Sequence, residues 1–175
     1  DLKTFRTAEI IELPNSAGNH SSPFGTENSE YIVAGTRFSV PEDGSNSDVP
    51  IDTYKDNFKG HISFVSIDKT SGDMNLAFQL KTPGINFDLA RAGKGKSAGW
   101  FFFSCYNSEQ ANTLLEVNAS QKDKDFIMAV NWKKAEEYVK AGKGKKQPVN
   151  YAHNKYNEET HTATSEMKKE VIVLD

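Results

Sequence analysis

The chain has 175 residues, of which 37% are hydrophobic and 26% charged, and its formal net charge is −3. This length suits one domain or part of a larger one, and the composition is typical of a folded chain rather than a disordered one. The slightly acidic balance excludes the basic footprint of a nucleic-acid-binding protein, and no apolar run approaches the roughly 18 residues of a membrane helix. The sequence begins at Asp1 without Met or a signal peptide, which indicates a processed chain or a fragment.

Two stretches near the beginning of the sequence have the composition of β-strands. Phe5 to Leu13 mixes apolar and polar residues before Pro14, and Glu30 to Val40 carries several β-forming residues before Pro41. Proline ends a strand because it cannot donate a ladder hydrogen bond. Between these stretches, Ser16 to Phe24 is rich in Ser, Gly, Asn and Pro, and we expect a loop there.

The clearest local pattern is a β-hairpin. Gly60 to Ile67 alternates apolar and polar residues, and Met74 to Leu80 keeps its apolar residues on one face. Asp68 to Asp73 lies between them and has turn composition, with Gly72 available for a positive φ. The sequence therefore predicts two antiparallel strands joined by a short turn.

The C-terminal part predicts one helix and a final strand. Asn131 to Ala141 begins with a residue suited to the N-cap, keeps its apolar residues on one stripe and is followed by a glycine. Lys143 to Glu166 has the composition of a long polar excursion, and Lys168 to Asp175 is expected to be a strand. We interpret Gly142 to Lys145 as a solvated basic turn.

An aromatic run and an oxygen-rich stretch follow one another in the centre of the chain. Trp100 to Phe103 is expected to be buried as a whole, because a surface that exposed it would aggregate. Tyr106 to Glu109 and Asn118 to Asp125 then offer hydroxyl, amide and carboxylate oxygens, the donors that calcium binds. On this chemistry alone, a solvated loop is the simpler interpretation of Glu109. Cys105, the only cysteine, is expected to be a small buried hydrophobe.

His20 lies among the small residues of the expected Ser16 to Phe24 loop. Neutral imidazole is the commonest protein ligand of transition metals, and copper accepts it readily. A single loop histidine is more often simply exposed, so the residue by itself leaves both interpretations open.

Three motifs, in order along the chain, resemble the central propeller segment of nitrous oxide reductases. They are Glu12-Leu13-Pro14-Asn15 followed by His20, Tyr106-Asn107-Ser108-Glu109 behind its aromatic run, and Asp125 followed by Phe126 to Trp132. The resemblance implies an all-β fold, consisting of about three consecutive blades of a seven-bladed β-propeller with one short inserted helix. Residues 1–175 would then be a partial segment of the N-terminal catalytic domain, and the C-terminal cupredoxin domain would not be present.

The resemblance also implies a copper site. His20 would be one of the seven imidazoles that hold a four-copper, sulfide-bridged catalytic cluster, although Ser21 stands where the family pattern has glycine. Asp88 would accept a hydrogen bond from a ligand imidazole and so fix its tautomer. A capping or turn role for Asp88 fits the sequence equally well.

A structural calcium ion is the second implied metal. Tyr106 and Glu109 would bind it through their side chains, and Val117 and Asp125 through their backbone carbonyls. Calcium there would tie the strand that ends at Tyr106 to the Asn118 to Asp125 loop.

The family reduces N₂O to N₂ and water with two electrons and two protons. The resemblance implies a periplasmic homodimer that takes electrons from a cytochrome or cupredoxin, with no nucleic acid and no membrane as partners. Because the chain contains one copper histidine of the family set, this segment alone is expected to be inactive. The alternative is a noncatalytic propeller-like or β-sandwich binding module without copper.

Overall fold

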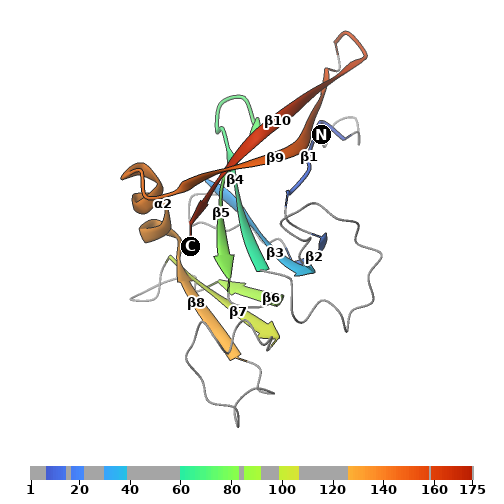
Figure 1. Ribbon diagram of the computed structural model, residues 1–175. Helices are drawn as coiled ribbons and strands as arrows, with labels where there is room; N and C mark the ends of the chain where they lie inside the picture. Colours follow the sequence, from blue (N-terminus) through green and yellow to red (C-terminus); the bar gives the residue numbers. More distant parts are fainter. Residues whose placement is uncertain are drawn as a thin grey trace.

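The computed structural model shows a mostly β protein with a short helix (Figure 1). It describes residues 7–14, 17–21, 30–38, 60–82, 85–91, 99–106, 126–157 and 159–174. Their strands form one large mixed sheet and one small antiparallel sheet, and the core lies between the two. Within these ranges no helix is long and apolar enough to cross a membrane. The expectation of a β fold with one short helix is confirmed at this level.

The large sheet contains seven strands and curls into a half-barrel. The strands are β1 (Glu9–Ile11), β2 (Ala17–Ser21), β3 (Tyr31–Phe38), β4 (Gly60–Ile67), β5 (Met74–Thr82), β9 (Lys145–Asn157) and β10 (Thr162–Leu174). Their order across the sheet is β1-β9-β10-β5-β4-β3-β2. All neighbours are antiparallel except β10 and β5, which pair in parallel at Val173–Gln79 and Leu174–Leu80. Strands from both ends of the chain thus share one sheet.

The part of the chain that the structure describes shows no propeller, although about three consecutive blades were expected. A propeller consists of separate four-stranded sheets set around a channel. Here β1, β9 and β10 extend the β2–β5 unit into one continuous sheet instead. The cause is the long β9–β10 hairpin, whose C-terminal end pairs with β5 while β9 pairs with β1.

The predicted hairpin is confirmed as β4 and β5. Asp68 closes its turn, because its backbone N–H donates to the Asp73 carbonyl at 2.9 Å and its carboxylate accepts from the N–H groups of Thr70 and Ser71, each at 2.8 Å. Gly72 has a φ of 79°, a left-handed conformation that glycine adopts without steric cost. The turn composition therefore determines this connection locally.

The predicted helix is confirmed as α2 (Trp132–Lys140). The Asn131 side chain caps it by accepting from the Lys134 N–H at 3.2 Å, which satisfies one of the free N–H groups of the first turn. Gly142 follows the helix with a φ of 69°, the left-handed conformation common after a C-terminus. Both ends of α2 therefore lie where the sequence places them.

The small sheet shows why the aromatic run is not buried as a whole. Its strands are β6 (Ile85–Arg91), β7 (Trp100–Tyr106) and β8 (Phe126–Asn131), in that order and antiparallel. Successive side chains of a strand point to opposite faces. Phe101 and Phe103 are accordingly fully buried, whereas Phe102 points outward and is 36% exposed. The expectation that all of Trp100 to Phe103 is buried is wrong for this reason.

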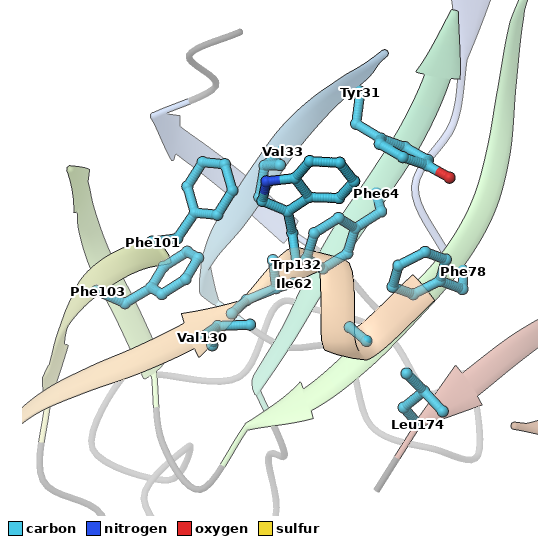
Figure 2. Close-up of a cluster of buried hydrophobic side chains, with 11 residues drawn as sticks. Tyr31, Val33, Ile62, Phe64, Phe78, Phe101, Phe103, Val130, Trp132 and Leu174 are labelled. Carbon is cyan, nitrogen blue, oxygen red and sulfur yellow. The ribbon is translucent and has the colours of Figure 1, made fainter. Parts of the chain in front are cut away.

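Aromatic side chains fill the space between the two sheets (Figure 2). Phe64 and Phe78 stack with their ring centroids 4.5 Å apart, and Tyr31 meets them edge-on at 6.3 and 6.1 Å. Trp132 of α2 also belongs to the cluster, and its ring centroid lies 5.9 Å from that of Tyr31. The buried cluster consists of Tyr31, Val33, Ile62, Phe64, Phe78, Phe101, Phe103, Val130, Trp132, Ala135 and Leu174.

Two segments that the sequence predicts to be irregular are strands. β2 lies inside the expected Ser16 to Phe24 loop and pairs with β3 through its backbone, which requires no apolar side chains. The expected polar excursion, Lys143 to Glu166, forms all of β9 and the beginning of β10. This hairpin is polar because its far half projects beyond the core, and the β10 residues from Thr162 to Met167 are all exposed (Figure 1).

We expect Phe101→Ala to lower the free energy of unfolding by about 3–5 kcal/mol, because it empties a fully buried aromatic site. Phe102→Ala, one residue along the same strand, is the matched control and should cost less than about 1 kcal/mol. Chemical denaturation of both variants measures the difference. Equal losses would contradict the inward and outward assignment of β7.

Candidate functional site

The predicted copper ligand His20 lies on β2, at an irregularity of its pairing with β3. Asn19 pairs with Thr36 and Ser21 with Gly35, so the register shifts at the position of His20. Such bulges redirect side chains and are frequent beside active sites. The side chain of His20 lies outside what the structure describes, so the copper role stays a prediction.

Asp88 lies on β6, also at a break in strand register. Asn86 pairs with Cys105 and Leu89 with Phe103, so Asp88 falls within the irregular step between them. The strand β6 packs against β3 and β2, which brings the strands of Asp88 and His20 close together. Only the backbone of Asp88 is described, and its hydrogen bond to a ligand imidazole therefore also stays a prediction.

The predicted calcium ligands lie at or beyond the ends of β7 and β8. Tyr106 is the last residue of β7, and its Cα is paired with that of Ile85. Glu109, Val117 and Asp125 lie outside the described residues, as does the side chain of Tyr106. Cys105 on β7 is paired with Phe126 on β8, so the two ends of the segment that contains all four positions lie next to each other.

Within the ranges that the structure describes, no group of three or more His, Cys, Asp and Glu side chains could hold a metal ion. The described residues therefore do not form a complete copper or calcium site by themselves.

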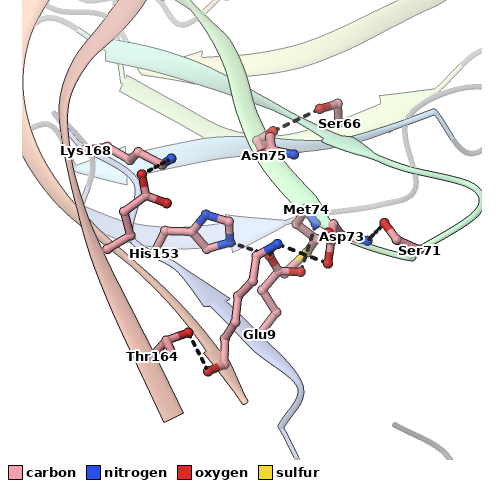
Figure 3. Close-up of polar contacts among 11 residues, drawn as sticks. Glu9, Ser66, Ser71, Asp73, Met74, Asn75, His153, Thr164 and Lys168 are labelled. Carbon is pink, nitrogen blue, oxygen red and sulfur yellow. Dashed lines mark hydrogen bonds and ion pairs between the residues drawn. The ribbon is translucent and has the colours of Figure 1, made fainter. Parts of the chain in front are cut away.

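The best-defined polar cluster surrounds the Glu9 carboxylate (Figure 3). His153 is buried and Glu9 is partly buried, with side chains 4% and 9% exposed, and Glu9 Oε1 accepts a hydrogen bond from His153 Nε2. The second oxygen, Oε2, accepts the backbone N–H of Met74 at 2.8 Å. Glu9 thus joins β1 to β9 and to the beginning of β5.

Two ion pairs border this cluster on its solvent side. Lys155 Nζ lies 3.0 Å from Asp73 Oδ1 and 3.6 Å from Glu9 Oε1. The hydrogen bond from Lys155 lowers the pKa of Asp73, and the same contact raises the pKa of Lys155. On β10, opposite His153, a hydrogen bond from Lys168 lowers the pKa of Glu166. The Lys155–Asp73 pair connects β9 to the turn before β5, whereas the Lys168–Glu166 pair lies within β10.

The Glu9 cluster has the character of a structural contact rather than a reactive one. Its histidine and carboxylate are buried against protein groups, and each Glu9 oxygen already accepts a hydrogen bond. Sequence reasoning missed it, because Glu9 and His153 are 144 residues apart and neither lies in a recognisable motif. Only the pairing of β1 with β9 brings them together.

Two further buried polar contacts connect distant elements. The Gln79 amide donates to the Pro14 carbonyl at 2.7 Å and to Ser63 Oγ at 2.9 Å. The Tyr31 hydroxyl donates to Glu136 Oε1 at 2.8 Å and so fixes α2 on β3. Burial, followed by this hydrogen bond, raises the pKa of Tyr31 well above its ordinary value, and the phenol therefore stays protonated as a donor.

Comparison with models of known protein families gives no match to this chain.

Glu9→Ala should reduce stability much more than removal of the neighbouring lysine. The substitution leaves His153 Nε2 and the Met74 N–H without their acceptor, and a buried orphan donor costs about 1–3 kcal/mol. Lys155→Met removes exposed ion pairs and should cost about 1 kcal/mol or less. Urea unfolding of the two variants makes the comparison, and similar losses would show that Glu9 is not the central contact.

The Asp73–Lys155 pair should contribute stability only within a pH window. The pKa of Asp73 is lower in the folded state than in the unfolded state. Its contribution to the free energy of unfolding is therefore fully present above the unfolded-state pKa of about 3.9 and is lost as the pH falls through the folded-state pKa. The pKa of Lys155 is raised in the folded state. Its contribution to the free energy of unfolding is therefore fully present below the unfolded-state pKa of about 10.4 and is lost as the pH rises through the folded-state pKa.

The measurement is the difference in unfolding free energy between the unaltered chain and Asp73→Asn across this range. The difference should be largest between about pH 5 and 9 and should shrink at both ends. Backbone hydrogen bonds from Ser71 and Thr70 also lower the pKa of Asp68, so Asp68→Asn is a control for the basic end of the range, where its difference should stay constant, and not for the acidic end. A difference for Asp73→Asn that stays constant with pH would contradict the assignment.

Proposed function

We propose that this chain is a segment of a copper-dependent nitrous oxide reductase, which reduces N₂O to N₂ and water. The observation that carries the proposal is the ordered set of motifs, above all Tyr106-Asn107-Ser108-Glu109 and the run from Asp125 to Trp132. In the fold the first motif begins at Tyr106, the last residue of β7, and the second contains β8, and β7 and β8 are paired directly. This pairing supports a shared calcium site, because such a site needs ligands from both flanks of the connecting segment.

The finer proposal is that residues 1–175 form about three consecutive blades of a seven-bladed propeller in the N-terminal catalytic domain; the strand order within β2–β5 and within β6–β8 fits it, whereas the single sheet that joins β1, β9 and β10 to β2–β5 does not. Strands β2, β3, β4 and β5 follow one another in sequence and pair antiparallel with their neighbours, as the strands of a blade do. Strands β6, β7 and β8 repeat this up-and-down order in a second sheet. On this proposal, the parallel contact of β10 with β5 is not a blade pairing.

The outer face of the small sheet also supports membership of a larger protein. Ala90, Phe102 and Ala129 are direct neighbours across the three strands and all are exposed, and Ile127 beside them is 69% exposed. An exposed apolar sheet face commonly marks a surface that another layer covers. A neighbouring blade would supply that layer.

In this proposal His20 contributes one imidazole to a four-copper cluster, and its other ligands come from residues that this chain does not contain. The bulge of β2 at His20 and the proximity of β6 fit a ligand imidazole supported by Asp88. When bound, the cluster would supply the electrons for N–O cleavage. Because this chain contains one copper histidine of the family set, it is expected to be inactive alone.

The remaining features of the proposal follow from the family. The whole protein would be a periplasmic homodimer with a cupredoxin domain beyond these residues, and a cytochrome or a cupredoxin would be its electron donor. Calcium at Tyr106, Glu109, Val117 and Asp125 would be structural. Neither nucleic acid nor a membrane is proposed as a partner.

A noncatalytic propeller-like or β-sandwich binding module without copper is the second candidate. The observation in its favour is the single curled sheet, which joins strands from both ends of the chain instead of separating them into blades. In such a module, His20 and Asp88 would be ordinary strand residues.

The test is elemental analysis and N₂O reduction with the intact source protein that contains this sequence. The unaltered protein should carry several copper ions and calcium, and His20→Ala should lose copper and nearly all activity. His161→Ala, at an exposed histidine near the tip of the β9–β10 hairpin, is the matched control and should keep both. Glu109→Gln should lose calcium before it loses copper.

Two outcomes would overturn the proposal. A copper-free source protein of about this length would favour the binding module, and an active, copper-loaded His20→Ala variant would remove His20 from the cluster.

A further inference from the structure

The helix α2 and the turn after it carry an excess of positive charge that the whole chain does not share. Residues 132–144 contain four lysines and two glutamates, a balance of +2, in a chain whose net charge is −3. A local surface whose charge is opposite in sign to that of a partner attracts the partner and steers its approach. Only those lysines that face solvent can contact a partner.

The packing of α2 turns its lysines outward. Trp132 and Ala135 are buried in the core, so the opposite side of the helix faces away from both sheets (Figure 1). We call the exposed residues on that side and in the following turn the α2 lysine face. It consists of Lys133, Lys134, Tyr138, Lys140 and Lys143, all of which are exposed.

The two glutamates of the helix do not neutralise this face. Glu136 is turned toward the sheet, where it accepts from Tyr31 and pairs with Lys140 at 3.0 Å. Among the described residues, no carboxylate pairs with Lys134 or Lys143. Glu137 alone remains as an exposed negative charge on the helix. The face is therefore positively charged even though one of its lysines is paired.

Tyr138 gives the face an amphipathic centre. Its side chain is 53% exposed, and Lys143 Nζ lies 4.6 Å from the centre of its ring. This cation–π contact holds the ring and an ammonium group together at the surface. Exposed tyrosines supply apolar contact area and a hydroxyl group, which makes them frequent energetic centres of protein interfaces.

We propose that the α2 lysine face docks a carboxylate-rich surface of a partner protein, independently of whether the chain belongs to a reductase. Nucleic acid fits less well, because the face has no arginine for bidentate phosphate contacts and the remainder of the chain is acidic. A membrane surface fits less well, because insertion requires several apolar residues and this face offers only Tyr138. Lysines around one tyrosine match a compact acidic protein patch.

The experiment measures binding of a fluorescently labelled oligoglutamate peptide to the 175-residue chain by fluorescence anisotropy at low ionic strength. The unaltered chain should bind, and added salt should weaken the binding because the contacts are exposed. The double variant K134E/K143E should bind about tenfold more weakly, since two attractive contacts become repulsive. The neutral variant K134Q/K143Q should lie between the two.

The matched control is K69E/K169E, which changes the net charge equally at two exposed lysines outside the face. It should weaken binding by no more than about twofold, because those charges act only at long range. Circular dichroism of every variant checks that the fold is kept.

Three results would overturn the proposal. These are no binding by the unaltered chain, equal losses in the variant and its control, and tighter lysine-dependent binding to anionic phospholipid vesicles or duplex DNA than to the peptide.

Discussion

The contact between the aromatic rings of the large sheet and α2 is the constraint on which the rest of the fold depends. Phe64 stacks on Phe78, and Tyr31 lies against both and against Trp132. Trp132 is the first residue of α2 and directly follows β8, so the same contact positions the helix and the small sheet. The backbone N–H of Trp132 also donates to the Gly99 carbonyl before β7 at 3.1 Å. One cluster thereby fixes the spacing of both sheets.

A second, polar constraint holds the beginning of the chain in place. β1 has only three residues, and backbone pairing alone over that length gives little stability. The Glu9 carboxylate adds contacts to β9 and β5, so a short strand becomes an anchored sheet edge. Burial makes these contacts strong and specific, because water does not compete for the donors.

Two exposed surfaces of the molecule are proposed to contact other protein. One is the apolar face of the small sheet around Phe102 and Ile127, and the other is the α2 lysine face. The first fits a further layer of the same protein, and the second fits a separate acidic protein. The proposed metal positions lie on β2, on β6 and at the ends of β7 and β8, so three of these strands are also the strands of the apolar face.

The sequence alone determined the local features whose physical causes are also local. The β4–β5 turn follows from Asp68 and Gly72, and the ends of α2 follow from Asn131 and Gly142, because each uses hydrogen bonds or φ preferences within a few residues. The motifs at His20 and Tyr106 were likewise visible in the sequence and carry the functional proposal. The strand β2 was missed because backbone pairing left no apolar pattern to detect.

Only the tertiary structure decided which strands share a sheet, which of two adjacent phenylalanines is buried, and which charges meet. The β9–β10 hairpin looked like a polar excursion because half of it is solvated, yet it joins β1 to β5. Glu9 and His153 are paired across 144 residues, and no local pattern encodes that distance. The physical reason is that strand pairing and ion pairing depend on how remote segments are brought together, whereas turns and helix caps depend on immediate neighbours.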